Sequence, residues 1–376
     1  MRIGFDGTPL LGRKTGIGWY THDLVHAVAH QAPDDQLIVF PISWRTARTL
    51  RLDRPQPANV AVRRRVAPAR PLWAMWDRLP FPPVEWLVDC DVFHATNYIA
   101  PPSRRVPTVV TVHDIGFIHR PTGVNADVAR MARLLPTVLR RAAAVITVSE
   151  FTRQELLDWL PELAERTTVV PNGSHRRAAP EANAAVVSGI LPGPPFALVL
   201  GTLEPRKNVV FALDALAQLR RRGVELRLVL AGASSPLLDV GRLLRERDLG
   251  PTDVVRTGYL TDGRVAALLA EARLLVFPSL YEGFGMPLLE AMEAGLPVVA
   301  TRAGATPETV GDAAVLVEPD NVEGLAEAMT SVAFDDEHRA TLVARGRARA
   351  ADFTWERAAA ASLAVYRQVT RAGAAS

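Results

Sequence analysis

The sequence has a single cysteine and no long apolar run. Cys90 has no second cysteine to pair with, and it lacks the cysteine and histidine companions of a structural zinc site. No apolar run approaches the roughly 18 residues that span a bilayer, and the opening MRIGFDG lacks the apolar region of a secretion signal. We therefore expect a cytoplasmic protein in which Cys90 is a small core residue.

The composition is that of a folded enzyme. Hydrophobic residues make up 48% and charged residues 22%, enough for a large core. A chain of 376 residues exceeds the size at which one core keeps growing, so we expect two domains. The net charge is only +3 and no nucleic-acid-binding module accompanies the basic residues, so nucleic acid is not an expected partner.

Arginines nevertheless cluster in the sequence, at 63–65, 140–141 and 220–222. The segment 63–86 interleaves further arginines with aromatic residues: Arg70, Trp73, Trp76, Arg78, Phe81 and Trp86. This pattern fits a surface resting on anionic lipid, at the inner face of the plasma membrane, and fits almost as well a solvated face above buried tryptophans. Prolines interrupt the segment, so one clean amphipathic helix is not expected.

The first half of the chain alternates strand-like and helix-like segments. It opens with a strand at 2–6, a glycine-rich loop at 7–18 and a helix to Ala29. Further apolar runs occur at 37–40, 92–94, 109–112, 145–148 and 169–170. Continuous β-branched runs separated by helices predict an α/β fold with a parallel sheet covered on both faces, whose ligands bind beyond the carboxyl ends of the strands.

The alternation restarts after a stretch rich in Pro, Ala and Gly between Pro171 and Pro195. We expect strands at 196–200, 226–231, 274–277 and 298–300, and helices at 209–222 and 322–332. Asn321 stands where it would cap the second of these helices, and two more helical stretches run to about Arg371. These patterns predict domains at 1–182 and 183–353, and a C-terminal helix at 354–376 that crosses back to the first domain.

The most distinctive motif is Glu282-Gly283-Phe284-Gly285-Met286-Pro287-Leu288-Leu289-Glu290, which follows an expected strand. Gly283 and Gly285 permit unusual backbone angles and close approach of a ligand, and Pro287 suits the first turn of a helix. Amides at such a helix start favour phosphate or sugar oxygens, and the two flanking carboxylates can accept hydrogen bonds from sugar hydroxyls. A capped helix start is the alternative, but capping requires neither two glycines nor a second acid.

This motif resembles the E-x7-E signature of retaining glycosyltransferases of family 4, which have the GT-B fold of two Rossmann-like domains facing a central cleft. The resemblance extends along nearly the whole chain, including Ser149-Glu150, Pro171-Asn172-Gly173 and the segment 201–208. It implies that Glu282 faces the donor sugar and that Glu290 binds the donor ribose. The loop residues that would hold sugar and phosphate are Gly283, Phe284, Gly285, Met286 and Pro287.

Arg206 and Lys207 follow the first strand of the second domain. Two adjacent cations there can neutralise a departing diphosphate, and charge-assisted bonds of about 1.5 to 3 kcal/mol each would stabilise the transition state. A solvated surface pair is the alternative. Many family members have an arginine directly after the glycine, where this chain has Thr202, and Arg206 is expected to take that role.

His113 and Asp114 end an apolar run, at the mouth of the first sheet. The resemblance implies that His113 contacts the donor sugar near the reacting carbon, and that its backbone helps to stabilise developing positive charge. A satisfied structural histidine is the alternative. His94 and His119 share this context without an equally strong motif.

The loop with Gly12, Gly16 and Gly18 resembles loops of the family that move over the donor phosphates and shape the acceptor site. It is not a phosphate-binding P-loop, because Arg13 intrudes before the lysine. It is not a dinucleotide fingerprint either, because Thr21 stands in the place of the last glycine. NAD binding is therefore not expected.

Asp89-Cys90-Asp91 imitates the D-x-D metal motif of the other large glycosyltransferase architecture. It precedes the strand at 92–94 instead of following one, which puts it at the wrong end of a sheet for a ligand. With no other metal-ligand cluster in the sequence, we expect metal-independent transfer and no cofactor besides the donor substrate.

The resemblance suggests that backbone groups near Gly232, Gly258, Tyr259 and Leu260 hold the nucleotide base, at the ends of second-domain strands. Guanine and uracil are hard to separate on that basis, so a UDP-sugar stays open as donor. GDP-mannose is favoured by similarity to mannosyltransferases with a Gly-Ile-Gly loop and a His-Asp pair.

Together these features predict a hexosyltransferase that moves a sugar, with mannose favoured, from a nucleotide-diphosphate sugar to a glycan or lipid-linked acceptor. Domain closure would bring Glu282, Arg206 and Lys207 over a donor that faces His113, and the anomeric configuration would be retained. Two alternatives stay open. One is a nucleotide-sugar epimerase or a phosphorylase-like enzyme of the same architecture, and the other is a catalytically silent nucleotide-sugar-binding subunit.

Overall fold

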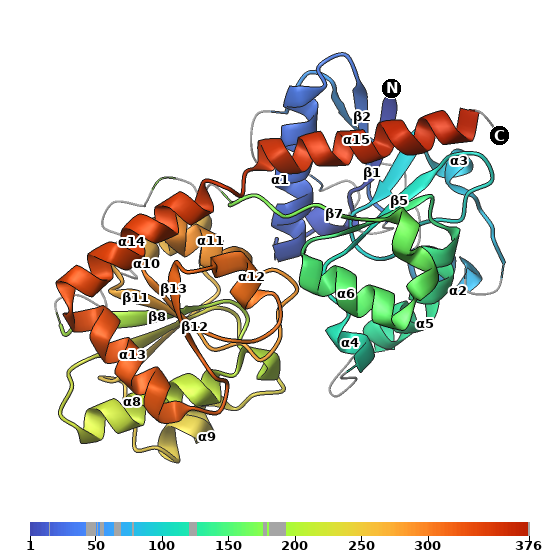
Figure 1. The fold of residues 1–376 in the computed structure, drawn as a ribbon. Helices are drawn as coiled ribbons and strands as arrows, with labels where there is room; N and C mark the ends of the chain where they lie inside the picture. Colours follow the sequence, from blue (N-terminus) through green and yellow to red (C-terminus); the bar gives the residue numbers. More distant parts are fainter. Residues whose placement is uncertain are drawn as a thin grey trace. The chain divides into compact units, whose positions relative to one another are not determined.

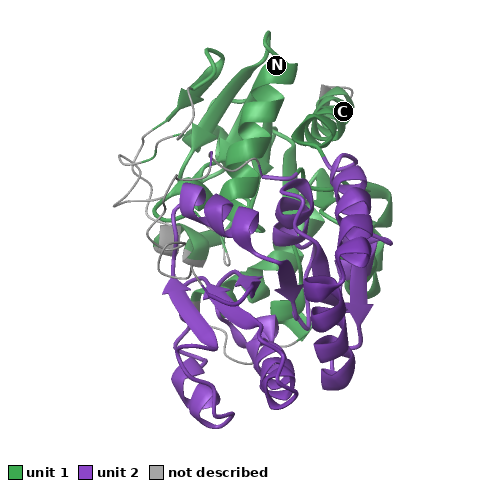
Figure 2. Ribbon diagram, turned by 90° about the vertical axis from the view of Figure 1, so that its left-hand side faces the viewer, with its two compact units in different colours: residues 1–173, 354–376 green, residues 174–353 purple. Residues whose placement is uncertain are grey.

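The computed structural model describes residues 1–14, 16–42, 50, 52, 56–63, 69–76, 79–119, 126–175, 179 and 193–374. The chain forms two compact units, one of Met1–Gly173 with Thr354–Ser376 and the other of Ser174–Phe353 (Figure 2). The last stretch of the chain therefore belongs to the same unit as the first. The predicted domain boundary at 182–183 lies outside the described residues.

The first unit is built on a parallel sheet in the order β3-β2-β1-β4-β5-β6-β7 (Figure 1). Its strands are β1 (Arg2–Asp6), β2 (Gln36–Phe40), β3 (Val60–Val62), β4 (Val92–Ala95), β5 (Thr108–Val112), β6 (Ala144–Thr147) and β7 (Thr167–Val169). Every residue of β4, β5 and β6 is buried, because helices cover both faces of the sheet and apolar side chains pack on each.

The second unit repeats this design with the order β10-β9-β8-β11-β12-β13, again all parallel. Its strands are β8 (Phe196–Leu200), β9 (Arg227–Ala231), β10 (Val254–Gly258), β11 (Leu274–Phe277), β12 (Val298–Thr301) and β13 (Ala314–Val317). The predicted α/β fold with two Rossmann-like sheets is confirmed.

Helices follow most strands in both units. Those of the first unit are α1 (Gly16–Gln31), α2 (Ala69–Trp76), α3 (Val84–Leu87), α4 (Gly116–His119), α5 (Ala126–Arg141), α6 (Glu150–Trp159) and α15 (Trp355–Ala374). Those of the second unit are α8 (Val209–Arg221), α9 (Val240–Arg245), α10 (Asp262–Glu271), α11 (Met286–Glu293), α12 (Thr306–Val310), α13 (Val322–Phe334) and α14 (Asp336–Ala350). Asn321 caps α13 as predicted, with its side chain accepting a hydrogen bond from Gly324 N at 2.8 Å.

The strand order reverses at the first strand of each unit. β1 lies between β2 and β4, and β8 lies between β9 and β11. The chain leaves two such neighbouring strands toward opposite faces of the sheet, and ligands of open α/β sheets bind between the diverging loops. The topology therefore brings together whatever residues follow β8 and β11, although those residues are far apart in the sequence.

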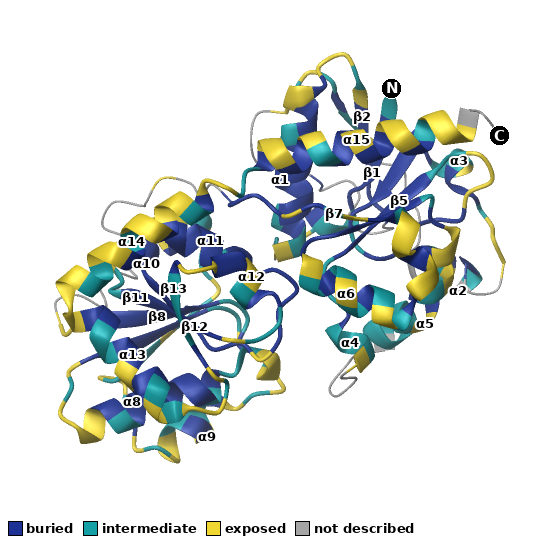
Figure 3. Cartoon of the chain, viewed as in Figure 1, coloured by how far each residue is buried: buried dark blue, intermediate teal, exposed yellow. Residues whose placement is uncertain are grey.

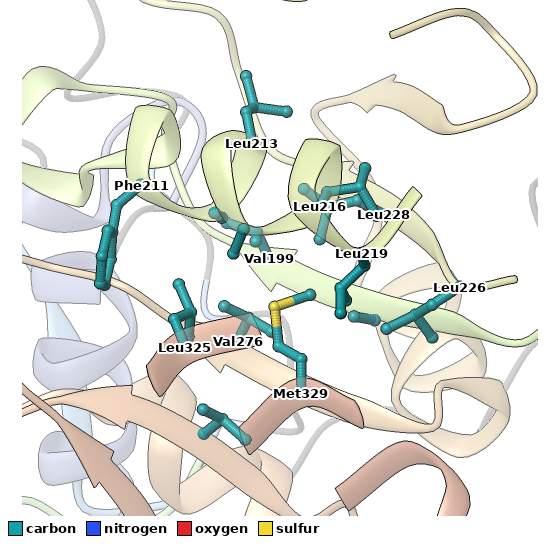
Figure 4. Close-up of a cluster of buried hydrophobic side chains, with 14 of the residues drawn as sticks. Val199, Phe211, Leu213, Leu216, Leu219, Leu226, Leu228, Val276, Leu325 and Met329 are labelled. Carbon is teal, nitrogen blue, oxygen red and sulfur yellow. The ribbon is translucent and has the colours of Figure 1, made fainter. Parts of the chain in front are cut away.

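Strand β8 supplies side chains to two separate cores. Ala197 and Val199 belong to the cluster with α8 and α13, and Phe196, Leu198 and Leu200 belong to the cluster with α10 and α11 on the opposite face. Alternation of side chains along a strand produces this division. Figure 4 shows the first cluster, in which the labelled side chains are Val199, Phe211, Leu213, Leu216, Leu219, Leu226, Leu228, Val276, Leu325 and Met329. In Figure 3 the strands β8 and β11 are buried throughout, whereas α14 and α15 show exposed residues on their outer faces.

The C-terminal helix α15 returns to the first unit, as the sequence predicts, and packs along α1. Its Tyr366 hydroxyl lies 2.6 Å from Nδ1 of His94 in β4, and Oγ1 of Thr111 in β5 lies 2.7 Å from Nε2. All three residues are completely buried. Burial lowers the pKa of His94 to about 3, so this histidine is neutral and joins helix to sheet through two uncharged contacts.

The glycine-rich loop near the amino terminus is shorter than predicted. Helix α1 begins at Gly16, so Gly16 and Gly18 lie in its first turn and not in the preceding loop. A Cβ on Gly18 would lie 2.8 Å from the carbonyl oxygen of Pro9. Gly18 therefore allows the loop to pack closely on the helix, which is a structural reason for glycine at this position.

The aromatic residues of the segment 63–86 divide between core and surface. Trp76 is buried and Trp73 packs partly buried against the same core cluster, whereas Phe81 and Trp86 are exposed. The arginines at 64, 65 and 78 and the side chain of Arg70 lie outside the described residues. Within the described parts of the chain, no helix is long and apolar enough to cross a membrane.

We expect the free energy of unfolding to fall by about 2 kcal/mol on account of His94 when the pH is lowered from 7 to 5. The unfolded histidine takes up a proton in this range, whereas the buried one, with a pKa of about 3, does not. Urea denaturation at both pH values measures the change. The variant His94→Gln should lose this part of the pH dependence, and His30→Gln, at an exposed position of α1, should keep it. An unchanged pH dependence in His94→Gln would contradict the assignment.

Candidate active site

The second unit gathers charged residues at the carboxyl ends of β8 and β11. Arg206 and Lys207 lie in a short turn, Pro205–Lys207, after β8, and Glu282 follows β11. A backbone hydrogen bond of 2.9 Å from Leu280 N to Arg206 O joins the two loops. These residues lie where ligands of doubly wound sheets bind.

Glu282 forms ion pairs with both cations. Lys207 Nζ lies 2.5 Å from Oε1 of Glu282, and Arg206 Nη1 lies 3.2 Å from Oε2. The Nε atom of Arg206 lies 3.1 Å from Oε2 of Glu204. Carboxylates therefore hold both cations in place before any ligand binds, and such preorganised charge is what stabilises a charged transition state.

The pair of Glu282 and Lys207 is nearly buried. Their side chains are 9% and 12% exposed, whereas that of Arg206 is 43% exposed. Burial acts to raise the pKa of Glu282, but Lys207 and Arg206 outweigh it and hold this pKa below its usual value. Burial lowers the pKa of Lys207, and Glu282 opposes that shift. Removal of Glu282 would leave the buried charge of Lys207 without its ion-pair partner, at a cost of about 3–5 kcal/mol.

Two residues of the loop that carries Lys207 have positive φ angles. Gly201, at the end of β8, has φ of +129°, and Asn208 has φ of 47°. The ammonium group of Lys207 also lies 4.8 Å from the ring centre of Phe277 in β11, a cation–π contact. Lys207 is thus held between a carboxylate and an aromatic face.

The glycine loop after Glu282 leads directly into α11. Gly285 caps the helix with φ of +97°, and a Cβ there would lie 2.6 Å from Cδ1 of Leu288. Pro287 stands in the first turn, as predicted. The carbonyl of Phe284 accepts a hydrogen bond from Thr309 Oγ1 at 2.6 Å. The loop conformation is therefore fixed by its neighbours and requires glycine at 285.

A turn after β12 supports Glu282, and the sequence analysis missed it. Ala305 N donates a hydrogen bond to the carbonyl oxygen of Glu282 at 2.9 Å. Gly304 has φ of +57°, and a Cβ there would lie 2.5 Å from that oxygen and 2.7 Å from the Glu282 nitrogen. Only glycine permits this approach. The available signal was a glycine shortly after a predicted strand and three residues before Pro307.

The predicted base-binding residues lie along the same edge of the second sheet. A Cβ on Gly232, which follows β9, would lie 1.8 Å from the carbonyl oxygen of Gly201, so the packing of these two loops alone requires glycine there. Tyr259 and Leu260 follow β10, and Tyr259 is 45% exposed. Glu290 is buried within α11. Roles of these residues in nucleotide binding stay predictions.

His113 belongs to the first unit and follows β5. Its Nε2 donates to the carbonyl oxygen of Thr96 at 2.8 Å, and the ring of Tyr20 packs edge-on with a centroid distance of 4.6 Å. Burial lowers the pKa of His113 to about 4. Its imidazole is therefore neutral and weakly basic at pH 7, which suits contact with a sugar better than proton abstraction.

The structure also shows where the remaining residues that the sequence analysis considered as site residues lie. Asp89 and Asp91 both pair with Arg2 and lie at the amino end of β4, the end of the strand that the sequence predicts for them. Cys90 is buried and would contact a Cβ on Gly4, as expected for a core residue. His119 lies exposed at the end of α4. Across the described ranges, no group of three His, Cys, Asp or Glu residues is arranged to hold a metal ion.

Two parallel sheets of this topology, with a cation-paired glutamate at the strand-order reversal of the second, define a glycosyltransferase of the GT-B fold. The chain matches the family models "Glycosyltransferase Family 4" over residues 15–175 and "Glycosyl transferases group 1" over residues 182–349. It is 30% identical to O-antigen chain mannosyltransferase B of Escherichia coli, over 98% of this chain and 100% of that protein. The chain belongs to the family 4 glycosyltransferases.

Two further similarities agree with this membership. The chain is 36% identical to the GDP-mannose-dependent alpha-(1-6)-phosphatidylinositol dimannoside mannosyltransferase of Mycobacterium tuberculosis, over 44% of this chain and 42% of that protein. Its fold is similar to that of sucrose-phosphate synthase from Thermosynechococcus elongatus, with a TM-score of 0.76 and 22% identity over 99% of both chains. The predicted family, fold and glycosyltransferase activity are thus confirmed.

We expect Gly304→Ala to lower kcat/KM for glycosyl transfer at least tenfold, because the added Cβ would push the backbone of Glu282 away from Lys207. Gly223→Ala is the matched control, since Gly223 also has a positive φ, of +73°, but a Cβ there would meet nothing within 4 Å. Both variants carry the backbone strain, and only the first displaces the carboxylate. Steady-state kinetics with thermal denaturation separates the two effects. Equal losses of activity in both variants would show that Gly304 does not position Glu282.

Proposed function

We propose that this chain is a retaining mannosyltransferase that takes mannose from GDP-mannose and adds it to a glycan or lipid-linked acceptor in polysaccharide biosynthesis, in the cytoplasm. The observation that carries the proposal is the nearly buried Glu282 held by Lys207 and Arg206 beyond β8 and β11. The sugar and the nucleotide are supported by the names of two relatives, of which one is GDP-mannose-dependent.

Lys207 and Arg206 would stabilise the leaving group of the transfer. In the transfer the bond between the anomeric carbon and the donor phosphate oxygen breaks, and negative charge builds on the diphosphate. Lys207 and Arg206 would stabilise that charge more strongly in the transition state than in the bound donor. The acceptor oxygen forms its new bond on the face that the phosphate leaves, and the acceptor proton passes to the departing phosphate oxygen. This route retains the anomeric configuration and needs no protein nucleophile.

Glu282 and His113 would orient the sugar. An ionised Glu282 can accept hydrogen bonds from sugar hydroxyls while it keeps the two cations in place. His113 donates its Nε2 proton to Thr96, so its Nδ1 is an acceptor for a sugar hydroxyl. Because its pKa is lowered to about 4, we assign it no role as general base at neutral pH.

A donor and product experiment tests the proposal. GDP should raise the melting temperature of the protein more than UDP or ADP at equal concentration, because a selective ligand stabilises the native state. With GDP-mannose and an acceptor glycan, NMR should show the anomeric configuration of the donor in the product, and excess chelator should leave the rate unchanged. An inverted product would refute retention, and loss of activity restored by manganese would refute metal independence. Turnover without acceptor, or binding of GDP with no turnover, would favour the epimerase or the silent subunit.

We expect Arg206→Gln to lower kcat/KM about 10- to 100-fold, which corresponds to the loss of one charge-assisted bond to the leaving diphosphate. The melting temperature should change little, because the side chain is 43% exposed. Arg302→Gln is the matched control, since Arg302 is an exposed arginine paired with Glu318 at 3.1 Å in the same unit. If the two variants retained equal activity, Arg206 would have no part in the reaction.

A further inference from the structure

Two buried tyrosines contact His113 through their rings. The ring centre of Tyr20 in α1 lies 4.6 Å from that of the imidazole, and the ring centre of Tyr98, in the loop after β4, lies 5.9 Å from it. The two ring planes stand at 85° and 77° to the imidazole, an edge-on arrangement that aromatic rings favour. Both tyrosines are buried, so the core of the first unit holds their rings.

The hydroxyl group of each tyrosine is anchored close to His113 in the sequence. The Oη atom of Tyr20 lies 3.0 Å from Oγ1 of Thr111, two residues before the histidine. The Oη atom of Tyr98 accepts a hydrogen bond of 3.1 Å from the backbone N of Asp114, the residue after it. Each tyrosine therefore contacts the imidazole with its ring and the neighbouring part of the chain with its hydroxyl group, which restricts movement of one relative to the other.

The anchor of Tyr20 belongs to the buried network that holds α15. Oγ1 of Thr111 also lies 2.7 Å from Nε2 of His94, whose Nδ1 lies 2.6 Å from the hydroxyl of Tyr366. Buried networks in which each member is hydrogen-bonded are rigid. The position of the Tyr20 ring is therefore fixed by packing that extends from α1 through the sheet to the C-terminal helix.

Tyr98 has a backbone conformation that is unfavourable for tyrosine. Its φ is 59°, and the other non-glycine residues with positive φ in the described part of the chain are Asn208 and Asp248. Asparagine and aspartate adopt this conformation more readily than a bulky residue does. Local strain of this kind persists where the surrounding structure enforces it, and it is common at functional sites. The contacts of Tyr98 with His113 and Asp114 indicate what its side chain does there.

We propose that Tyr20 and Tyr98 are positioning residues that hold the imidazole of His113 in one orientation, with Nε2 donating to the carbonyl oxygen of Thr96 and Nδ1 available to a sugar hydroxyl. A single hydrogen bond leaves a ring free to tilt, whereas two rings packed edge-on against it do not, and a site group acts only when its supporting residues hold it in place. Neither tyrosine needs to touch the substrate. The proposal rests on the proposed contact of His113 with the donor sugar.

NMR of the imidazole nitrogens tests the orientation directly. At pH 7 the wild type should contain His113 only as the Nε2–H tautomer. Tyr20→Leu and Tyr98→Leu should each give a mixture of tautomers, whereas Tyr20→Phe, which keeps the ring, should keep the single tautomer. Both tautomers in the wild type, or a single tautomer in both leucine variants, would overturn the proposal. The wild-type measurement decides even if a leucine variant fails to fold, and it requires no donor or acceptor.

Kinetics with GDP-mannose connect the orientation to the reaction. Each leucine variant should lower kcat about 10- to 100-fold and change KM for the donor less than about threefold, because misplacement of a reacting group by about 1 Å costs on this scale. Tyr20→Phe should recover most of kcat. In the His113→Ala background neither leucine variant should lower kcat further, because the group that the rings position is absent. Undiminished losses in that background would contradict the proposal. Wild-type kcat in His113→Ala itself would instead refute the proposed role of His113, and the NMR result would still decide whether the rings fix the imidazole.

Tyr366→Leu is the matched control. It removes a buried ring from the same network, but this ring contacts Phe5 and His94, at centroid distances of 6.1 and 5.5 Å. It should lower the melting temperature as the other leucine variants do, and it should leave the tautomer of His113 and kcat unchanged. If this control lost kcat and the single tautomer to the same extent, a general loosening of the first unit would explain all three variants and the proposal would fail.

Discussion

The ion pair between Glu282 and Lys207 is the interaction on which the site of the second unit depends. Both side chains are nearly buried, and each keeps its charge because the other compensates it. Such a pair requires two loops to be held at fixed distance. The bond between Leu280 and Arg206 and the turn at Gly304 supply that restraint, so the arrangement is determined by backbone packing before a ligand binds.

The two units have the same order of strands around their first strand but differ in the residues that this order brings together. In the second, the strand-order reversal at β8 and β11 concentrates charge and glycine-rich turns. In the first, a buried network of His94, Thr111 and Tyr366 joins the last helix of the chain to the sheet through neutral groups. The carboxyl end of β5 carries His113, whose lowered pKa keeps it uncharged. The second unit thus gathers charged residues beyond its strands, whereas the first holds the last helix of the chain through neutral groups.

Local sequence patterns predicted most of the fold because buried parallel strands are short, apolar and β-branched. The strands at 2–6, 196–200 and 274–277 have the predicted bounds. The patterns missed β3 and β13, and they placed Gly16 in a loop although it begins α1. Glycine is a weak signal of secondary structure, because it occurs in loops, at helix starts and at close backbone contacts.

The sequence by itself determined the family, the alternation of strands and helices, and the residues of the acidic glycine motif, because each of these is a local pattern. The tertiary structure alone decided that Lys207 meets Glu282 across 75 positions of sequence, that Gly304 supports that glutamate, and that Trp86 is exposed while Trp76 is buried. The physical reason is that partners of this kind are chosen by strand order and side-chain packing. Strand order and side-chain packing join residues that are distant in the sequence, so neither can be detected in the few residues over which a periodic pattern is found.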